Sequence, residues 1–359
     1  MTVFLYLNEK QEGSLLGIVV KNLTKKYGTK TVVDNLSFEM KQPGVYALLG
    51  TNGAGKTTSI RMILGMLEKD EGEALWDDKP INFDNCNIGY LAEERGLYPK
   101  YSLIDQIRYF GELRGVSGAE LDKRIRYWAE RLKLIEYIYP DEFVDEREED
   151  NEAESDDMDE EYTDKGAGKK KLNAFSAGMK KKKKKPLSPD QLSKGNQQKI
   201  QFLIGMLSDP DLLVLDEPFS GLDPVNTDIL KEVIREEIKA GKYIIMSSHQ
   251  MEAVEEFCTD ITILNRSKAV VQGNLNDIKK AYGRVNLILK TESDVGYVLE
   301  KMNANVVTEK EGEYHIKVSG DEEAQELLKA IMSEGITVIR FELSELSLHE
   351  IFVKEVGQE

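Results

Sequence analysis

A short run near residue 50 combines glycines, a lysine and threonines at spacing that can do chemistry. The run reads Gly50-Thr51-Asn52-Gly53-Ala54-Gly55-Lys56-Thr57-Thr58. It fits the pattern G-x-x-x-x-G-K-[ST], which cradles a polyphosphate where a strand passes into a helix. An apolar run at 45–49 and a helical pattern at 59–67 supply that context. The alternative is a glycine turn that merely ends a buried strand; the agreement of motif and context favours the polyphosphate site.

Each residue type in this run has a chemical reason. Glycines let backbone N–H groups approach a polyphosphate closely. The helix that begins near Lys56 directs the positive end of its dipole at the same anion. Lys56 is long enough to reach the β- and γ-phosphates, and the Thr57 hydroxyl can coordinate Mg²⁺. The run therefore predicts a site for a polyphosphate with Mg²⁺.

A second chemical segment is Leu212–Glu217, where four apolar residues end in two acids. Such an unbroken apolar run predicts a strand buried on both faces, and hence a parallel sheet. Asp216 at its end can hold Mg²⁺ directly or through water. Glu217 alternates away from the metal and can act as general base toward a water molecule. The alternative is that the two acids cap a helix before Pro218.

The composition limits the classes of protein and partner. A chain of 359 residues can hold two domains, and its 40% apolar content fits a soluble globular protein. The net charge of −17 argues against nucleic acid as the main partner, because phosphate backbones call for basic faces. No apolar run reaches the ~18 residues that suggest a membrane span. The isolated Cys86 and Cys258 and three scattered histidines suit a reducing compartment and predict no zinc site.

Alternating strands and helices must position the two chemical segments. Strands are predicted at 16–20, 31–33, 36–40, 45–49, 73–76, 87–91, 212–215, 243–246, 261–265 and 269–271. Helices are predicted at 59–67, 103–114, 119–134, 196–207, 224–240 and 251–257. This alternation predicts a doubly wound α/β core with its sites at the carboxyl ends of the strands.

The apolar pattern stops between residues 141 and 186. An acidic run at 141–164 is followed by a lysine-rich run at 165–185. Such blocks bury almost nothing apolar, so we expect a disordered insert. Besides a solvated loop, a second interpretation is that the lysines touch anionic lipid headgroups.

A second domain pattern begins at residue 283. Strands are predicted at 285–289, 306–309, 314–318 and 338–342, and helices at 294–302, 322–334 and 347–356. The order β-α-β-β-α-β-α resembles a split βαβ, ferredoxin-like unit, and it carries no chemical motif. We therefore divide the chain into an N-terminal extension at 1–13, a main domain at 14–282 with the charged insert at 141–186, and an α+β accessory domain at 283–359.

Six segments in this order resemble the motifs of ABC-type ATPases, the nucleotide-binding subunits of ABC transporters. The resemblance covers residues 16–281 apart from the insert. The segments are Tyr27, the phosphate loop Gly50–Thr57, the stretch 88–93 ending at Glu93, Leu192–Gln198 in place of the signature LSGGQ, Leu212–Glu217 followed by a D-loop at 220–223, and His249. A segment at 175–180 also looks like a signature, but it runs into lysines rather than an amphipathic helix, and we set it aside.

The resemblance implies an ATP site with Mg²⁺ and assigns roles to single residues. ATP binding falls to residues 50–58 and to Tyr27, which stacks on adenine. The implied metal ligands are Thr57, Glu93 and Asp216, and the implied catalytic residues are Glu217, His249 and Lys56. In this family the signature surface closes on ATP bound to the opposite subunit, so a homo- or heterodimer is implied. The residues implied there are Ser193, Lys194, Gly195, Asn196 and Gln197, with Asp223 in the D-loop.

Three positions depart from the family pattern. Glu93 stands where glutamine is usual, which adds a negative charge beside the phosphates. Lys194 replaces the first signature glycine and Asn196 the glutamine; Lys194 either adds positive charge near the phosphates or faces solvent. The stretches 91–98 and 192–198, with the C-terminal domain, resemble the sodium- and drug-exporter-like branch of ABC-2 type ATPases.

The resemblance implies an α/β P-loop NTPase (ABC ATPase) domain with a helical subdomain, followed by a small ferredoxin-like α+β domain. The expected function is an ATP-hydrolysing subunit that dimerises around ATP–Mg²⁺ and powers a separate transmembrane permease, in export. Such a subunit is cytoplasmic and sits on the inner face of the cell membrane through the permease. The alternatives are a soluble ABC ATPase acting on ribosomes or DNA, and a regulator that binds nucleotide without hydrolysing it.

Overall fold

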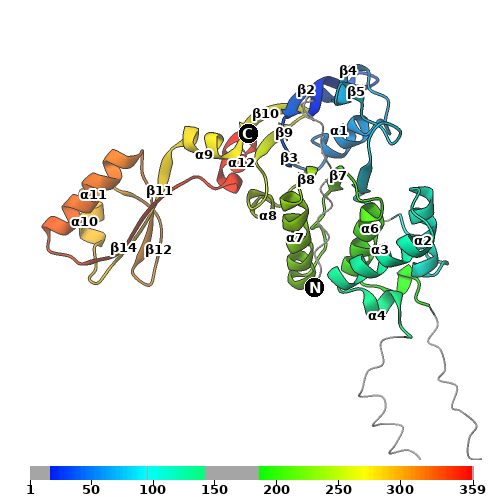
Figure 1. Ribbon diagram of the computed structural model, residues 1–359. Helices are drawn as coiled ribbons and strands as arrows, with labels where there is room; N and C mark the ends of the chain where they lie inside the picture. Colours follow the sequence, from blue (N-terminus) through cyan, green and yellow to red (C-terminus); the bar gives the residue numbers. More distant parts are fainter. Residues whose placement is uncertain (1–16, 95, 142–185, 358–359) are drawn as a thin grey trace, which may run out of the picture. The chain divides into compact units, whose positions relative to one another are not determined.

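The computed structural model describes residues 17–94, 96–141 and 186–357 (Figure 1). The predictions for the N-terminal extension, for nearly all of the charged insert and for the signature-like segment at 175–180 lie outside the described residues.

The described chain forms two compact units. The first holds the described residues up to Glu93, then Pro210–Ser220, and the described residues from Ile234 onward. The second holds the described residues of Glu94–Asp209 together with Gly221–Val233.

A six-stranded sheet in the first unit carries the strands with the longest apolar runs (Figure 1). Its order is β10-β9-β3-β8-β7-β6; β9 to β6 run parallel, and β10 is an antiparallel edge. The bounds are Gly44–Gly50 for β3, Ile88–Leu91 for β6, Leu212–Asp216 for β7, Tyr243–Ser248 for β8, Asp260–Asn265 for β9 and Lys268–Asn274 for β10. Every residue of β3, β7 and β8 is buried, as parallel strands covered on both faces require.

A separate four-stranded antiparallel sheet, of order β2-β1-β4-β5, belongs to the same unit. Its strands are Ile18–Tyr27 (β1), Lys30–Met40 (β2), Glu71–Trp76 (β4) and Lys79–Pro80 (β5). We predicted one doubly wound core and did not predict that these strands form a sheet of their own. We also predicted two strands, at 31–33 and 36–40, where the single strand β2 is continuous. The strand passes Asn35 with a left-handed φ of 54°, and the Asn35 N–H donates to Thr24 Oγ1 at 3.1 Å. This bulge accommodates the polar residues that suggested a break.

Helix α1 (Lys56–Ile63) lies between the two sheets and packs on strands of both. Its buried Ile60 and Met62 join Leu36 and Leu48 in one hydrophobic cluster. The helix ends earlier than predicted because Gly65 takes a left-handed φ of 69°. Burial of α1 on both sides fixes the position of its first turn, which follows directly from β3.

The second unit is helical. Its helices are Leu103–Leu113 (α2), Gly118–Arg131 (α3), Ile135–Ile138 (α4) and Lys194–Met206 (α6), with a 3₁₀ turn at Pro189–Gln191; α7 (Pro224–Lys239) begins in this unit. Ser102 caps α2 by accepting from the Asp105 N–H at 3.3 Å. The helix predicted at 119–134 corresponds to α3, which ends at Arg131 because Lys133 takes a left-handed φ of 54°; the short α4 was not predicted.

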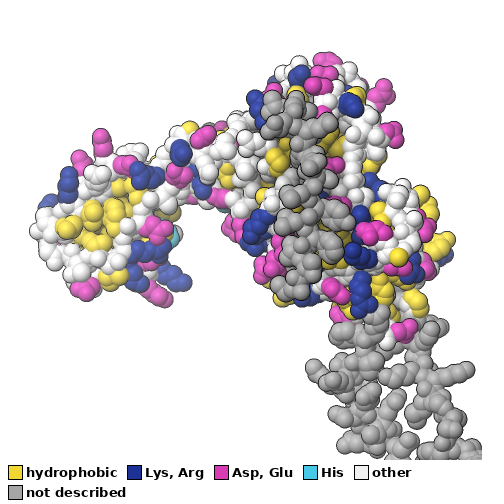
Figure 2. All heavy atoms as spheres, in the orientation of Figure 1, with side chains coloured by type: hydrophobic (Ala, Val, Ile, Leu, Met, Phe, Trp, Pro, Cys, Tyr) yellow, Lys and Arg dark blue, Asp and Glu magenta, His cyan; other side chains and the backbone are white. Residues whose placement is uncertain are grey.

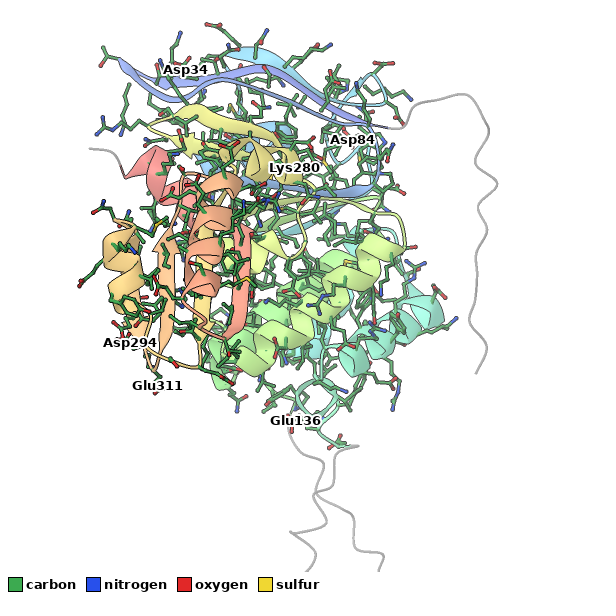
Figure 3. The ribbon with its side chains drawn as sticks, turned by 90° about the vertical axis from the view of Figure 1, so that its left-hand side faces the viewer. Asp34, Asp84, Glu136, Lys280, Asp294 and Glu311 are labelled. Carbon is green, nitrogen blue, oxygen red and sulfur yellow. The ribbon has the colours of Figure 1, made fainter. Side chains whose placement is uncertain are left out.

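A third sheet forms near the C-terminus, in the antiparallel order β12-β13-β11-β14. Its strands are Arg284–Thr291 (β11), Asn305–Lys310 (β12), Glu313–Lys317 (β13) and Val338–Glu345 (β14). The remaining helices are Met251–Glu255 (α8), Leu275–Tyr282 (α9), Gly296–Lys301 (α10), Asp321–Ser333 (α11) and Leu348–Val356 (α12). The core beside this third sheet includes Leu287 and Leu289 of β11 and Leu327 and Ile331 of α11. This strand order is that of a ferredoxin-like unit; Figure 3 labels Glu311 in the β12–β13 turn.

Candidate nucleotide-binding site

The loop from Gly50 to Thr58 joins β3 to α1 in the first unit. Gly55 caps α1 with a left-handed φ of 108°, and a Cβ there would lie 2.5 Å from the Val32 carbonyl oxygen. Gly53 takes a φ of 80°. At residue 55 only glycine can adopt the left-handed φ and also leave room for the Val32 carbonyl oxygen, so the loop conformation depends on this glycine. Thr51, Asn52 and Gly53 are exposed at the loop surface.

Lys56 is the first residue of α1, and its side chain is buried with 6% exposure. Its Nζ donates to the Gly50 carbonyl oxygen at 2.9 Å and to that of Thr51 at 3.3 Å. The same atom lies 3.2 Å from Glu217 Oε1, whose side chain is 5% exposed. The loop lysine and the acid that follows β7 therefore share one buried ion pair, although 161 residues separate them in sequence (217 minus 56).

Asp216 ends β7 and is fully buried. Its Oδ1 accepts from Ser247 Oγ at 2.5 Å and from Thr57 Oγ1 at 3.3 Å. Its Oδ2 is buried and has no hydrogen-bond partner among the described residues. Burial raises the pKa of Asp216, an effect that hydrogen bonds from Ser247 and Thr57 oppose.

These oxygens fit Mg²⁺. A magnesium ion takes oxygen ligands and uses one or two protein groups, with water and substrate phosphates completing the shell. Thr57 Oγ1 and the unpartnered Asp216 Oδ2 are such groups, and the hydrogen bond from Thr57 Oγ1 to Asp216 Oδ1 brings the two side chains together. A cluster of three or more acidic, cysteine or histidine ligands does not occur in the described part of the chain.

Glu217 has an unusual backbone. Its φ is 52°, in the left-handed region that a β-carbon disfavours, and its N–H donates to Ser247 Oγ at 3.0 Å and to the Ser247 carbonyl oxygen at 3.2 Å. Its Oε2 lies 2.7 Å from His249 Nδ1 and accepts from the His249 N–H at 3.2 Å. A strained, buried acid held between a lysine and a histidine is a hallmark of a functional site.

Two residues implied by the family resemblance stay outside this cluster. Tyr27 ends β1 with 55% exposure, and Lys25 Nζ lies 5.5 Å from the centre of its ring. Glu93 follows β6 and is exposed. Both side chains are exposed, whereas Lys56, Asp216 and Glu217 are buried.

The signature residues and Asp223 of the D-loop lie in the second unit. Ser193 caps α6 by accepting from the Asn196 N–H at 3.2 Å, and Gln197 Nε2 donates to the Pro189 carbonyl oxygen at 2.9 Å. Lys194 is exposed, whereas Gly195 and Asn196 are buried. A Cβ on Gly195 would lie 3.0 Å from Asn226 Nδ2. Asp223 caps α7 by accepting from the Asn226 N–H at 2.9 Å.

Sequence reasoning missed Ser247, which contacts both acids of the site. A signal was present, because Tyr243–Met246 is an unbroken apolar run and Ser247 is the first polar residue after it. The parallel register pairs Ser247 with Asp216 across β8 and β7. That pairing could not be read without knowing that the two strands are neighbours.

A strand–loop–helix with a buried lysine, two acids and a histidine is typical of a nucleotide-binding site, and comparison with known proteins gives the family of the chain. The family model described as ABC transporter matches residues 33–220, and one described as the C-terminal domain of DrrA1-3-like ATP-binding proteins matches residues 273–356. The chain belongs to the ABC transporter ATP-binding family. It is an ATP-binding subunit of this class, and the predicted ABC ATPase fold is confirmed.

Individual relatives agree with this assignment. The uncharacterized ABC transporter ATP-binding protein YhaQ of Bacillus subtilis (strain 168) is 36% identical over 341 residues, covering 95% of this chain and 98% of that protein. Nod factor export ATP-binding protein I of Cupriavidus metallidurans is 27% identical over 263 residues, covering 72% and 71%. A solved structure of an ATP-binding subunit of an ABC transporter aligns with a TM-score of 0.55 at 25% identity, covering 74% of this chain and 92% of that one. Among the described helices, none has the length and apolar character to cross a membrane.

Proposed function

We propose that this ABC ATP-binding subunit hydrolyses ATP with Mg²⁺ and uses the cycle to drive a separate transmembrane permease. The observation that carries the proposal is the convergence of Lys56, Asp216, Glu217 and His249 at the carboxyl ends of β3, β7 and β8. In open α/β sheets this edge is where ligands bind. We assign 14–282 to the ATPase domain and 283–359 to the accessory domain, supported by a separate sheet that begins at Arg284.

The side chains divide the chemistry between them. Lys56 and the backbone N–H groups of 50–58 bind the β- and γ-phosphates, and Tyr27 stacks on adenine. Thr57, Glu93 and Asp216 would hold Mg²⁺, which would neutralise charge on the phosphates. Glu217 accepts a proton as a water oxygen attacks the γ-phosphorus and the bond to the β–γ bridging oxygen breaks. His249 orients Glu217 and reaches the γ-phosphate.

Phosphate release from ATP tests the chemistry. Replacing Glu217→Gln should lower turnover by about 10²- to 10⁴-fold while ATP binding persists, because a general base contributes that much. Glu300→Gln, an exposed acid on α10, is the matched control and should hydrolyse ATP like the wild type. Hydrolysis by Glu217→Gln within threefold of the wild type would remove Glu217 from this role.

We also propose that two ATPase subunits close around the nucleotides. The first unit supplies the phosphate loop and the acids, while Ser193, Lys194, Gly195, Asn196 and Gln197 begin a separate helix in the second unit, with the D-loop Asp223 beside α7. The N-terminus of α6 can bind a second anion. Sedimentation of Glu217→Gln should show an ATP–Mg²⁺-dependent dimer, and Ser193→Arg should abolish it; an ATP-independent monomer throughout would contradict the proposal.

The permease is proposed to dock on the helical unit. Exposed aromatic and aliphatic side chains gather there, which marks protein interaction surfaces. These residues are Tyr98, Tyr101, Tyr109 and Leu113. A relative's name refers to Nod factor export, which favours export as the direction; the subunit would then act in the cytoplasm on the inner face of the membrane. Co-purification of a permease encoded beside this chain tests the idea, and Tyr109→Glu with Leu113→Glu should abolish capture without lowering ATP binding.

A further inference from the structure

Ser247 lies at the end of β8 with no solvent exposure, beside both acids of the ATP site. A serine hydroxyl has one hydrogen to donate and two lone pairs that accept. Here Oγ donates to Asp216 Oδ1 at 2.5 Å and accepts from the Glu217 N–H at 3.0 Å. One hydroxyl thus contacts the side chain of the first acid and the backbone of the second.

The hydrogen bonds from Ser247 and Thr57 fix the orientation of the Asp216 carboxylate. Because Ser247 and Thr57 both donate to Oδ1, the other oxygen, Oδ2, is kept without a partner among the described residues. Without the Ser247 hydroxyl, the carboxylate could rotate about its terminal torsion, which has a broad and shallow preference. The hydroxyl therefore selects which oxygen is presented to a cation.

The same hydroxyl acts on Glu217 through its backbone. A left-handed φ of 52° is unfavourable for a residue that carries a β-carbon. The N–H of Glu217 is held by both Ser247 Oγ and the Ser247 carbonyl oxygen, so the turn that creates this φ is fixed from β8. That turn aims the Glu217 side chain at Lys56 and His249.

We propose that Ser247 is a positioning residue that presents one oxygen of Asp216 to Mg²⁺ and holds Glu217 in its strained turn. The inference rests on the proposed function, because it gives Asp216 and Glu217 their roles. Ser248 is the internal contrast: it is equally buried, but its Oγ accepts from the Gln250 N–H at 2.9 Å and touches neither acid. Position in the β7–β8 register, rather than burial of a serine, gives Ser247 its task.

The test uses the full chain with three variants. Ser247→Ala removes the hydroxyl, and Ser247→Cys keeps similar size with a much weaker donor. Ser59→Ala is the matched control, since Ser59 is fully buried in α1 and its hydroxyl has no hydrogen-bond partner among the described residues. Two readouts need no turnover. One is Mg²⁺ affinity of the chain with ATP bound, followed by fluorescence titration; the other is hydrogen exchange of the peptide covering 213–219 without nucleotide or metal.

Partners that orient metal ligands typically contribute 10- to 100-fold in metal affinity or activity. Ser247→Ala should therefore weaken Mg²⁺ binding by about 10-fold or more and speed exchange at 213–219, with Ser247→Cys intermediate and Ser59→Ala unchanged. ATP binding in EDTA should stay within twofold. If Ser247→Ala does not fold, Ser247→Cys decides alone. Wild-type Mg²⁺ affinity and exchange in a folded Ser247 variant would overturn the inference, whereas failure of the wild type to bind or hydrolyse ATP would overturn the proposed function instead.

Discussion

The acids of the ATP site and those of the C-terminal domain are held in opposite ways. Asp216 and Glu217 are buried, and one Asp216 oxygen has no hydrogen-bond partner among the described residues. In the C-terminal domain, Glu350 is one-third exposed and accepts from Lys317 Nζ at 2.6 Å, from Asn286 Nδ2 at 2.8 Å and from its own helix start. Figure 2 shows acidic and basic side chains interspersed on the drawn surface.

The two environments shift the pKa values of Asp216 and Glu350 in opposite directions. Burial raises the pKa of Asp216 despite two hydrogen bonds. Partial burial acts in the same sense on Glu350, but the hydrogen bonds from Lys317, the Ser347 N–H and Asn286 together outweigh it and lower its pKa to about 2. The first arrangement costs stability, because burial disfavours the charged form of an acid that is incompletely hydrogen-bonded, whereas the second stabilises the fold. The chain therefore places its incompletely hydrogen-bonded acid in the ATP site and its fully hydrogen-bonded acid in the C-terminal domain.

The strongest test of this contrast is Lys56→Ala. ATP hydrolysis should fall by about 10³-fold, the upper end of the effect of losing one charge-stabilising donor. The chain should also lose about 3 kcal/mol of unfolding free energy, because breaking a buried ion pair leaves Glu217 less compensated. Phosphate release and chemical denaturation measure the two effects.

The double variant Lys56→Ala with Glu217→Gln separates the effects. Removing both charges should restore most of the lost stability, because no uncompensated buried charge remains. Hydrolysis should stay absent. If stability does not recover, the buried pair is not the source of the loss.

A substitution in the core of the C-terminal domain should lower stability without affecting ATP binding. Leu327 on α11 is 1% exposed within the cluster that includes Leu289 and Ile331. Leu327→Ala should destabilise this domain by about 2–5 kcal/mol through lost burial and a cavity. ATP binding should remain within twofold. Hydrogen exchange across 284–345 reports the first effect and nucleotide titration the second; equal loss of ATP binding would show that the domain supports the site.

Much of this fold was predictable because its signals are local. Buried parallel strands appear as apolar runs, as at 45–49 and 212–215, and their alternation with helices gives the α/β class. The errors came where single residues override periodicity. Asn35 carries β2 through a bulge, and Lys133 follows the early end of α3, each with a left-handed φ that its residue type only weakly predicts.

The site was predictable to the extent that motif spacing fixes it. Lys56, Asp216 and Glu217 gather as the chemistry of their segments required. The role of Ser247 depends on the neighbouring register of β7 and β8, a long-range pairing that no local pattern encodes. Glu93 and Tyr27 come from the family resemblance, and their roles stay predictions that the proposed experiments address.

The smallest effect concerns Glu350 and pH. Its pKa in the folded chain, about 2, lies below the ordinary value, so its stabilising effect is complete above about pH 5 and is lost as pH falls toward 2. After allowance for its partial exposure, this is worth about 1 kcal/mol. Glu350→Gln should lower the stability of the C-terminal domain by that amount at pH 7 and flatten its decline between pH 5 and 2.

Arg340→Ala is the control for Glu350. Arg340 also pairs with acids, Glu313 and Glu342, but these three residues lie on strands β13 and β14, and none of them takes part in a helix cap as Glu350 does. Such surface pairs contribute about 0.5 kcal/mol or less. Urea unfolding from pH 2 to 7, followed by hydrogen exchange in 284–345, compares the variants. An Arg340→Ala loss equal to that of Glu350→Gln would mean that charge pairing alone, rather than the cap and its hydrogen bonds around Ser347, stabilises this domain.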